Sequence, residues 1–375
     1  MTKDPGDIND PKPSFKRCVN KILLSMGIIE FVFIIRLYFD RGVSLSDLIR
    51  ISFYLSSLYA LFALRKLSFR WKNLILYWND VEMALLNKLH SNDNDTNLLA
   101  KITIITVILM CGAIFDQIVY CLDEIADSNQ IYHQCNITKY TSWEFLFHKM
   151  HPQYLVALPY HAVLFLPAEW VNACLNLAWN MQDILIIVVS LALIERFALW
   201  NSRVQRYELQ VIPGRIWWEL REDYTRLTEL VLKVDEHLST MILVSCAANL
   251  YQICSCVYQS LIPRPDFLDN LQFWYTFLFT LVRSILVFHF VAEIHERSVQ
   301  SKLTIRIIPS KVKQLFFLQA QRLLDQMVSM DIALSGRKLF YITRKTILII
   351  LATVMTYEIV LVDRIPKEPL KKRVC

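Results

Sequence analysis

Motifs that carry chemistry are missing from this sequence. Only 6 of its 375 residues are glycine, and it contains no GxGxxG, no P-loop and no HExxH pattern. Its 9 cysteines are scattered, without a CxxC pair or a histidine at metal-ligand spacing. We find no set of side chains suited to acid/base, nucleophilic or metal chemistry. The sequence therefore predicts a protein that is not an enzyme and that uses no cofactor or metal.

Charge is also scarce. Charged residues make up 20% of the chain and hydrophobic residues 55%, which is too apolar for an ordinary soluble domain of this length. No cleavable signal peptide is expected, because the N-terminal tail is polar and no small-residue cleavage site follows the first apolar run. For the net charge of +6, anionic membrane lipids are the simplest counter-charge, and nucleic acid is not implied. The composition indicates a membrane protein.

The chain does contain seven apolar stretches. The hydrocarbon core of a bilayer, ~30 Å thick, needs about 20 mostly apolar residues per helix. The fourth stretch is longer than this, so we expect its last turns to continue as helix outside the membrane. The sequence thus predicts an all-α membrane protein with seven transmembrane helices, at Ile22–Phe39, Leu48–Leu64, Leu99–Cys121, Leu155–Leu193, Ser239–Ile262, Leu271–Val291 and Leu339–Val362.

Lysine and arginine in the connections predict the orientation, because basic residues are retained on the cytoplasmic side. They gather in residues 1–21 and in the second, fourth and sixth connections, and are few in the first, third and fifth. This pattern predicts an inverted topology, with the N-terminus in the cytoplasm and the C-terminus outside. A G-protein-coupled receptor has the opposite orientation. The basic residues of 363–375 depart from the pattern, because they would lie outside.

Two cytoplasmic connections carry apolar residues at helical spacing. The first should form an amphipathic helix that runs directly into the fifth span. We expect both stripes to be buried against neighbouring subunits rather than lipid, because their opposite faces carry charges of both signs. The stripes consist of Trp217, Leu220, Tyr224, Leu227 and Leu230/Val231, and of Val312, Leu315, Phe316, Leu323 and Met327.

Polar side chains recur at spacings of three or four along the fourth span, so they share one face of a helix. Ionisable residues at membrane depth are costly and normally face a protein interior or a water-filled cavity. More polar residues lie in the third and fifth spans. We predict a ligand-binding pocket formed by Glu169, Asn172, Asn176, Trp179, Asn180, Asp183, Asp116, Gln117, Asn249 and Gln252.

This pocket is suited to a neutral sugar or polyol. The hydroxyl groups of such a ligand need fixed donors and acceptors, and its C–H face stacks on an aromatic ring. The alternative is that the polar side chains only hydrogen-bond between helices and hold the bundle together.

The third connection, predicted to lie outside, contains the acceptor triplet for N-glycosylation at Asn136. Cys121 and Cys135 bracket the same connection, and the sequence leaves open whether they form a disulfide. A second triplet, at Asn94, lies on the predicted cytoplasmic side and should remain unmodified.

The end of the last span resembles the C-terminal signature of the insect gustatory receptors, which is Thr-Tyr, five apolar residues and Gln-Phe. Other stretches are similar to the sugar-sensing branch of that family. The resemblance covers about Leu48 to Val362. It is carried by Thr356-Tyr357-Glu358-Ile359-Val360-Leu361-Val362, Trp179-Asn180-Met181-Gln182-Asp183, residues 243–251, Ala333-Leu334-Ser335-Gly336 and Thr343-Arg344-Lys345.

The resemblance implies an insect chemoreceptor-type channel subunit in the cell membrane of a gustatory neuron. It would form a homo- or heterotetramer with other gustatory receptors, bind a sugar or related small polar tastant, and need no G protein. The resemblance also implies a cytoplasmic tail at 1–21 and spans one to four with the pocket at 22–196. Cytoplasmic anchor helices with spans five and six would follow at 197–338, the pore-lining span at 339–362 and an extracellular tail at 363–375.

The resemblance also places the pore and gate at Tyr357, Glu358, Leu361, Val362 and Asp363. Asp363-Arg364 stands where the family has Gln-Phe. In a tetramer these residues would form rings of four Asp and four Arg around the pore, and such charged rings would not block ions by dewetting as an apolar ring does. The sequence leaves open a different gate or an incorrect exon join. It also leaves open a non-conducting co-receptor subunit, a receptor for a bitter or other tastant, and a membrane transporter. Against a transporter, we find no internal repeat and no pair of broken spans.

Overall fold

The computed structural model describes residues 15–41, 45–86, 93–156, 159–207, 213–260, 264, 266–307, 314–329 and 332–364. Helices account for most of these ranges. The described ranges contain no strand, and their extended segments pair only in an isolated bridge between Ser335 and Tyr341. The predicted all-α class is confirmed.

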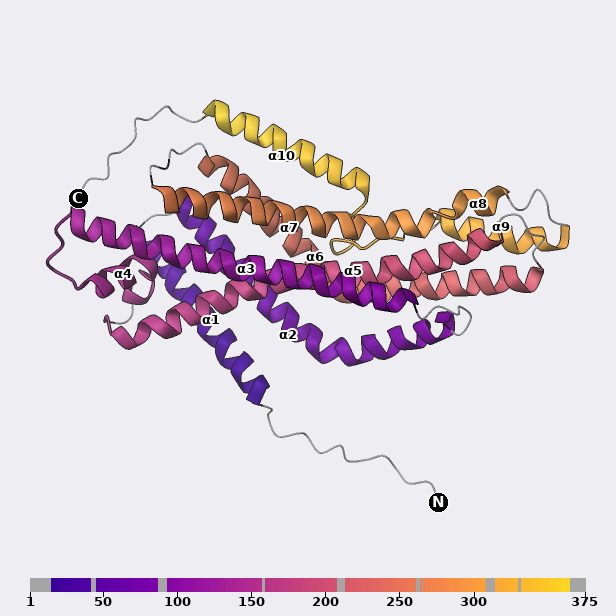
Figure 1. The fold of residues 1–375 in the computed structure, drawn as a ribbon, viewed down its shortest axis with the longest axis horizontal. Coiled ribbons are helices and arrows are strands. Elements are labelled where there is room, and N and C mark those ends of the chain that lie inside the picture. The colour runs from indigo at the N-terminus through magenta and orange to yellow at the C-terminus, as the bar shows by residue number, and fades with distance from the viewer. Residues whose placement is uncertain are drawn as a thin grey trace, which may run out of the picture.

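The helices form an elongated bundle, with α4 near one end, α8 and α9 near the other, and α10 set along one side (Figure 1). Two short 3₁₀ turns, η1 and η2, precede α5. The elements are α1 (Phe15–Arg41), α2 (Leu45–Leu86), α3 (Asp93–Gln134), α4 (Ser142–Met150), η1 (Tyr154–Val156), η2 (Ala162–Leu164), α5 (Phe165–Arg206), α6 (Gly214–Ser260), α7 (Phe267–Val299), α8 (Lys302–Ile307), α9 (Gln314–Ser329) and α10 (Arg344–Arg364).

Six helices of the described residues are long and apolar enough to cross a membrane, namely α1, α2, α3, α5, α6 and α7. They correspond to the first six predicted spans. α10 has 21 residues. At about 1.5 Å per residue it extends for about 32 Å, which matches the hydrocarbon core. α10 is therefore long enough to be the predicted seventh span, which stays a prediction.

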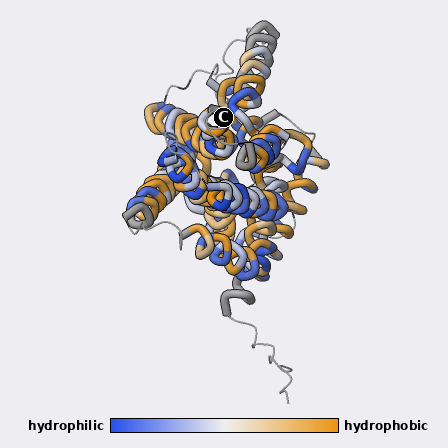
Figure 2. Tube along the Cα trace, turned by 90° about the vertical axis from the view of Figure 1, so that its right-hand side faces the viewer, coloured by the Kyte–Doolittle hydropathy of each residue, from blue (hydrophilic) through white to orange (hydrophobic). Residues whose placement is uncertain are grey.

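Hydrophobic residues lie on the outside of the bundle as well as inside it (Figure 2). α5 is the most buried of the six candidate spans and α3 the least. α5 packs against α2, α3, α6 and α7, so it is the central helix. On α3, Leu99, Ile104 and Ile108 are exposed, as expected for a helix that faces lipid.

The predicted start of the fourth span at Leu155 is wrong. α5 begins at Phe165, and the chain before it forms η1 and η2. The reason is Pro159, which lacks an amide hydrogen and disfavours helical geometry in the residue before it. Pro167 is tolerated because the first-turn N–H groups of a helix have no helical partner. The last turns of the predicted span are helical as expected, and α5 continues beyond its predicted end at Leu193 to Arg206.

The predicted start of the last span at Leu339 is also wrong, because α10 begins at Arg344. The residues before it form a tight turn in which Arg337 and Lys338 have φ angles of 53° and 60°. Such left-handed geometry does not occur inside a right-handed helix. Helix formation therefore starts only after this turn.

The expected amphipathic helix is confirmed as the first half of α6, which continues without a break into the fifth span. Its stripe is buried inside the chain, however, and not against another subunit. Trp217, Leu220 and Tyr224 are fully buried, and they belong to the same core as Trp200 of α5 and Leu323 of α9. The expectation of a subunit contact is wrong for these residues, because α5, α7 and α9 supply the covering walls.

We expect Gly112→Ala to lower the free energy of unfolding by about 1–3 kcal/mol. An added Cβ would lie 2.6 Å from Cε2 of Phe279, so α7 could no longer approach α3. The same approach lets the Tyr275 hydroxyl donate to the carbonyl of Gly112 at 3.0 Å. Thermal unfolding of the detergent-solubilised receptor measures the change. The exposed neighbour Cys111 is the control: Cys111→Ala should have no effect, and equal stability of both variants would contradict the prediction.

Candidate functional site

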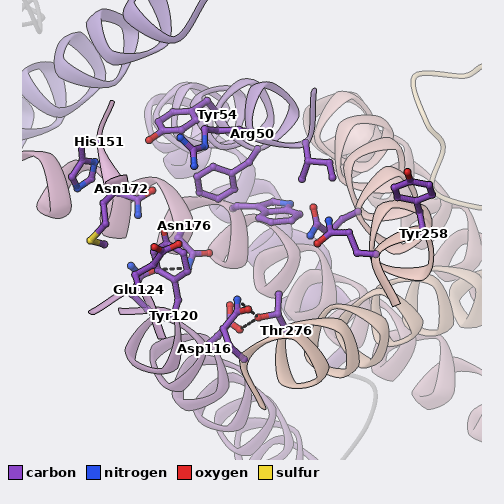
Figure 3. Close-up of a pocket in the computed structure, with 18 residues that line it drawn as sticks. Arg50, Tyr54, Asp116, Tyr120, Glu124, His151, Asn172, Asn176, Tyr258 and Thr276 are labelled. Carbon is purple, nitrogen blue, oxygen red and sulfur yellow. Dashed lines mark hydrogen bonds between the residues drawn. The ribbon is translucent and has the colours of Figure 1, made fainter. Parts of the chain in front are cut away.

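A cavity of about 480 Å³ opens between α2, α3, α5, α6 and α7, beside Met150 of α4. Its volume lies within the range of about 300–1,000 Å³ that small-molecule pockets have. Polar side chains from several helices surround a common space in which aromatic rings also lie (Figure 3). The lining residues are Ile49, Arg50, Phe53, Tyr54, Asp116, Gln117, Tyr120, Glu124, Met150, His151, Asn172, Asn176, Trp179, Gln252, Tyr258, Gln259, Gln272 and Thr276.

The predicted pocket residues occupy three places relative to this cavity. Glu169 lies behind its wall, where it bonds to lining residues. Asn180, Asp183 and Asn249 are fully buried and do not line it. The residues that do line it are Asn172, Asn176, Trp179, Asp116, Gln117 and Gln252.

The cavity wall contains a continuous row of hydrogen bonds between α3 and α5. The Asn176 amide donates to Oε1 of Gln117 at 2.7 Å, and the Gln117 amide donates to Oε1 of Glu169 at 3.1 Å. The other oxygen of Glu169 lies 3.3 Å from Nε2 of His151. At the inner end, the Asn180 amide donates to Oδ1 of Asn176 at 3.0 Å. The row therefore connects the α4 end of the cavity to the groups beneath it.

Beneath the cavity lies a buried ion pair. Nε of Arg283 in α7 is 2.9 Å from Oδ2 of Asp183 in α5, and both side chains are inaccessible to solvent. Ser245 and Asn249 of α6 donate to the two Asp183 oxygens at 2.5 and 2.9 Å. Paired carboxylate and guanidinium groups with further hydrogen bonds are the form in which buried charge is tolerated. The pair joins three helices at one point.

Arg283 also connects this ion pair to the cavity. Its guanidinium donates to the side-chain oxygens of Asn180 and Asn249. It lies 4.6 Å from the ring centre of Trp179, a cation–π distance. Because Trp179 lines the cavity, its ring is next to both the cavity and the Arg283 guanidinium.

The sequence analysis missed Arg283, Arg50 and His151. Arg283 lies inside the sixth predicted span, and Arg50 inside the second. An arginine within an apolar span was the signal that could have found both, because such residues face a protein interior. His151 lies in the third connection, between α4 and η1, and the sequence carries no signal for its position beside Glu169.

The cavity wall is braced at the α4 end. Nζ of Lys149 in α4 lies 2.9 Å from Glu124, which lines the cavity, and 2.6 Å from Asp127. Burial lowers the pKa of Lys149, but the bonds to both carboxylates outweigh it and raise the pKa above its ordinary value. Tyr54 is held similarly: its hydroxyl donates to Oε1 of the buried Glu30 at 2.9 Å.

The structure decides the question that the sequence left open: Cys121 and Cys135 do not form a disulfide with each other. The thiol of Cys121 is free and donates to Glu169 at 3.3 Å, whereas Cys135 is disulfide-bonded. The two residues lie more than three helical turns apart in sequence, and α3 continues through Cys121 to Gln134. A helix holds side chains at this separation too far apart to be bridged.

Asn136 lies exposed in the turn after α3, with a φ of 50° that asparagine tolerates. We expect it to carry a glycan, so Asn136→Gln should migrate faster on a gel, like wild-type receptor treated with a glycosidase. Asn94→Gln should migrate like the wild type. A shift with the Asn94 variant alone would reverse the predicted orientation.

The predicted pore residues Tyr357, Glu358, Leu361, Val362 and Asp363 belong to the second half of α10, and their side chains lie outside the described residues. In the first half of α10, Leu348 and Ile349 are exposed. α10 rests on α6 and α7.

In the described residues, six long apolar helices and a polar, aromatic-lined cavity between five of them are the features of a multi-pass membrane protein with a ligand pocket. The described chain resembles the insect olfactory receptor OR5 from Machilis hrabei with a TM-score of 0.70 at 13% identity, covering 96% of this chain and 92% of that one. A second structure of that receptor, in complex with eugenol, also gives a TM-score of 0.70, at 12% identity. At this identity the likeness shows that the two chains share a fold.

The family model for the trehalose receptor matches residues 1–375. The Drosophila melanogaster gustatory receptor for sugar taste 61a is 26% identical over 364 residues, which are 96% of this chain and 82% of that protein. The Drosophila gustatory receptor 5a for trehalose is 31% identical over 192 residues, 51% of this chain and 43% of that protein. The chain therefore belongs to the trehalose receptor family, in the sugar-sensing branch of the insect gustatory receptors. It is a taste receptor of the membrane and not an enzyme.

Proposed function

We propose that the chain is a subunit of a cation channel in gustatory neurons, and that a sugar bound in the cavity opens it. The observation that carries this proposal is the make-up of the cavity. Amide, hydroxyl and carboxylate groups from five helices converge on one space that also contains the faces of Trp179 and Phe53. The name of a relative, a gustatory receptor for trehalose, supports the same ligand class.

The charges around the cavity favour a ligand without net charge. Glu124 is paired with Lys149 and Arg283 with Asp183. The other two charged side chains of the wall, Arg50 and Asp116, have opposite signs. The ligand therefore meets groups whose charges are largely balanced. Its hydroxyls would bond to the amides of Asn172, Asn176 and Gln252, and its C–H face would stack on Trp179.

Opening requires that the sugar binds the open state more tightly than the closed one. In the proposal the N-terminus lies in the cytoplasm, the cavity faces outside, and four subunits place their α10 helices around a central pore. The exposed apolar residues Leu348, Ile349 and Met355 support this arrangement, because α10 lies along one side of the bundle (Figure 1) and the chain leaves them uncovered. A sugar that draws α5, α6 and α7 together would move α10, which rests on two of them.

Whole-cell recording tests the function. Cells that express the chain should give a cation current with trehalose or another mono- or disaccharide, and none without it. A current that appears only with a second gustatory receptor identifies a co-receptor subunit. Sugar uptake that saturates without single-channel events identifies a transporter, and a response only to bitter compounds identifies another ligand class.

A further inference from the structure

The turn before α10 is fastened to α6 by one buried side chain. The carboxylate of Asp235 accepts a hydrogen bond from the backbone N–H of Ser335 at 2.6 Å and another from the Ser335 hydroxyl at 2.8 Å. Both residues are buried. A carboxylate that receives two hydrogen bonds away from water is a strong and directional contact. We call this pair the Asp235–Ser335 clamp.

The clamped turn is itself tightly built. The hydroxyl oxygen of Ser335 accepts from the N–H of Lys338 at 3.0 Å, and Gly336 and Phe340 are joined by a backbone hydrogen bond of 2.9 Å. A Cβ on Gly336 would lie 2.5 Å from the Phe340 ring, so only glycine allows the turn to close. The turn ends three residues before Arg344, the first residue of α10. It is a compact link that passes a displacement on to α10.

α6 and α7 both lead from the ion pair beneath the cavity to this link. In α6, Asp235 precedes Ser245, the donor to Asp183, by ten residues, and both lie within the same unbroken helix. In α7, Glu293 follows Arg283 by ten residues. At about 1.5 Å per residue, each separation is about 15 Å. Because each helix is continuous over this distance, we expect a shift of either helix at the ion pair to move the base of α10 as well.

The contacts at that base differ in environment. Arg344 pairs with Glu293 at 2.9 Å and with Glu296 at 3.8 Å, but the arginine is exposed, and such pairs are weak and screened by salt. The clamp is buried and made to the backbone. We propose that Asp235 is the positioning residue that couples sugar binding to the movement of α10, through Ser335. This inference rests on the proposed function and adds the residue pair that would transmit the signal.

The experiment uses a reporter that works without ion flow. Lys345→Cys places a thiol at the exposed start of α10, where labelling by a fluorescent maleimide is followed with and without a mixture of trehalose, sucrose, glucose and fructose. We expect sugar to change the labelling rate of the reporter receptor at least about fivefold, a normal size for coupling between sites. Asp235→Asn should reduce this change to less than about twofold while sugar still raises the thermal stability of the receptor. Ser335→Ala, a milder variant, should reduce it partly.

Glu236→Gln is the matched control, because Glu236 is the exposed neighbour of Asp235 in the same helix. It should leave the labelling change intact. A full labelling change in Asp235→Asn and Ser335→Ala would overturn the proposal. The proposal would also be overturned if folded Ser335→Ala receptor lost both sugar binding and the labelling change. It would be overturned as well if no sugar changed the labelling rate of the parent reporter receptor. Sugar-dependent labelling in a receptor that carries no current would instead remove the channel function and leave the coupling in place.

Discussion

Arg283→Met is expected to lower the free energy of unfolding by about 3–5 kcal/mol and to keep most of the receptor from the cell surface. The substitution leaves the carboxylate of Asp183 fully buried with no opposing charge within the network. Ser245 and Asn249 still donate to it, but neutral donors do not replace a cation at 2.9 Å. Surface biotinylation and thermal unfolding in detergent measure the two effects.

Removing both charges should undo most of this loss. Arg283→Met combined with Asp183→Asn leaves no buried charge, and neutral replacements of a buried pair are often tolerated. Arg215→Met is the control for losing an arginine at an exposed position, and it should change stability by less than about 0.5 kcal/mol. If the double variant is as unstable as the single one, the destabilisation does not come from an unpaired charge.

The sequence predicted the helices well and their ends poorly. Apolar stretches located α1, α2, α3, α5, α6 and α7, because burial in lipid requires apolar residues whatever the neighbours are. The end of α2 illustrates the limit: the predicted span stops at Leu64, whereas the helix runs to Leu86. Past Leu64 the helix is amphipathic, so its hydropathy falls although its hydrogen bonding continues.

Helical spacing predicted the lining residues of α5, and polar residues inside apolar spans pointed to Asp116, Gln117 and Gln252 of α3 and α6. A spacing of three or four residues placed Asn172, Asn176 and Trp179 on one face of α5, and all three line the cavity. The same spacing could not show that Asp183 lies beneath it, because depth depends on α6 and α7. Arg283 is 100 residues from Asp183 in the chain, and no periodicity connects them.

Asn176→Leu is expected to raise the sugar concentration for half-maximal current at least about 100-fold, or to abolish the response. Asn176 lines the cavity and holds Gln117 and Asn180 in place through hydrogen bonds of 2.7 and 3.0 Å. Leucine has nearly the same size but can neither bond to a sugar hydroxyl nor satisfy these two amides. A site whose polar groups lose their partners discriminates strongly against its own ligand. Dose–response recording over a trehalose and sucrose series measures the shift.

The conservative and matched variants separate binding from folding. Asn176→Gln retains the amide and should shift the curve less than leucine does. Leu177→Ala changes the next residue of α5, which is exposed and does not line this cavity, and should leave the half-maximal concentration unchanged. Surface labelling must show all three variants at the membrane, because the prediction for Asn176→Leu is a lower affinity for sugar and not a lower amount of receptor. An unchanged curve for Asn176→Leu at normal surface density would mean that sugar does not bind where α3 and α5 meet.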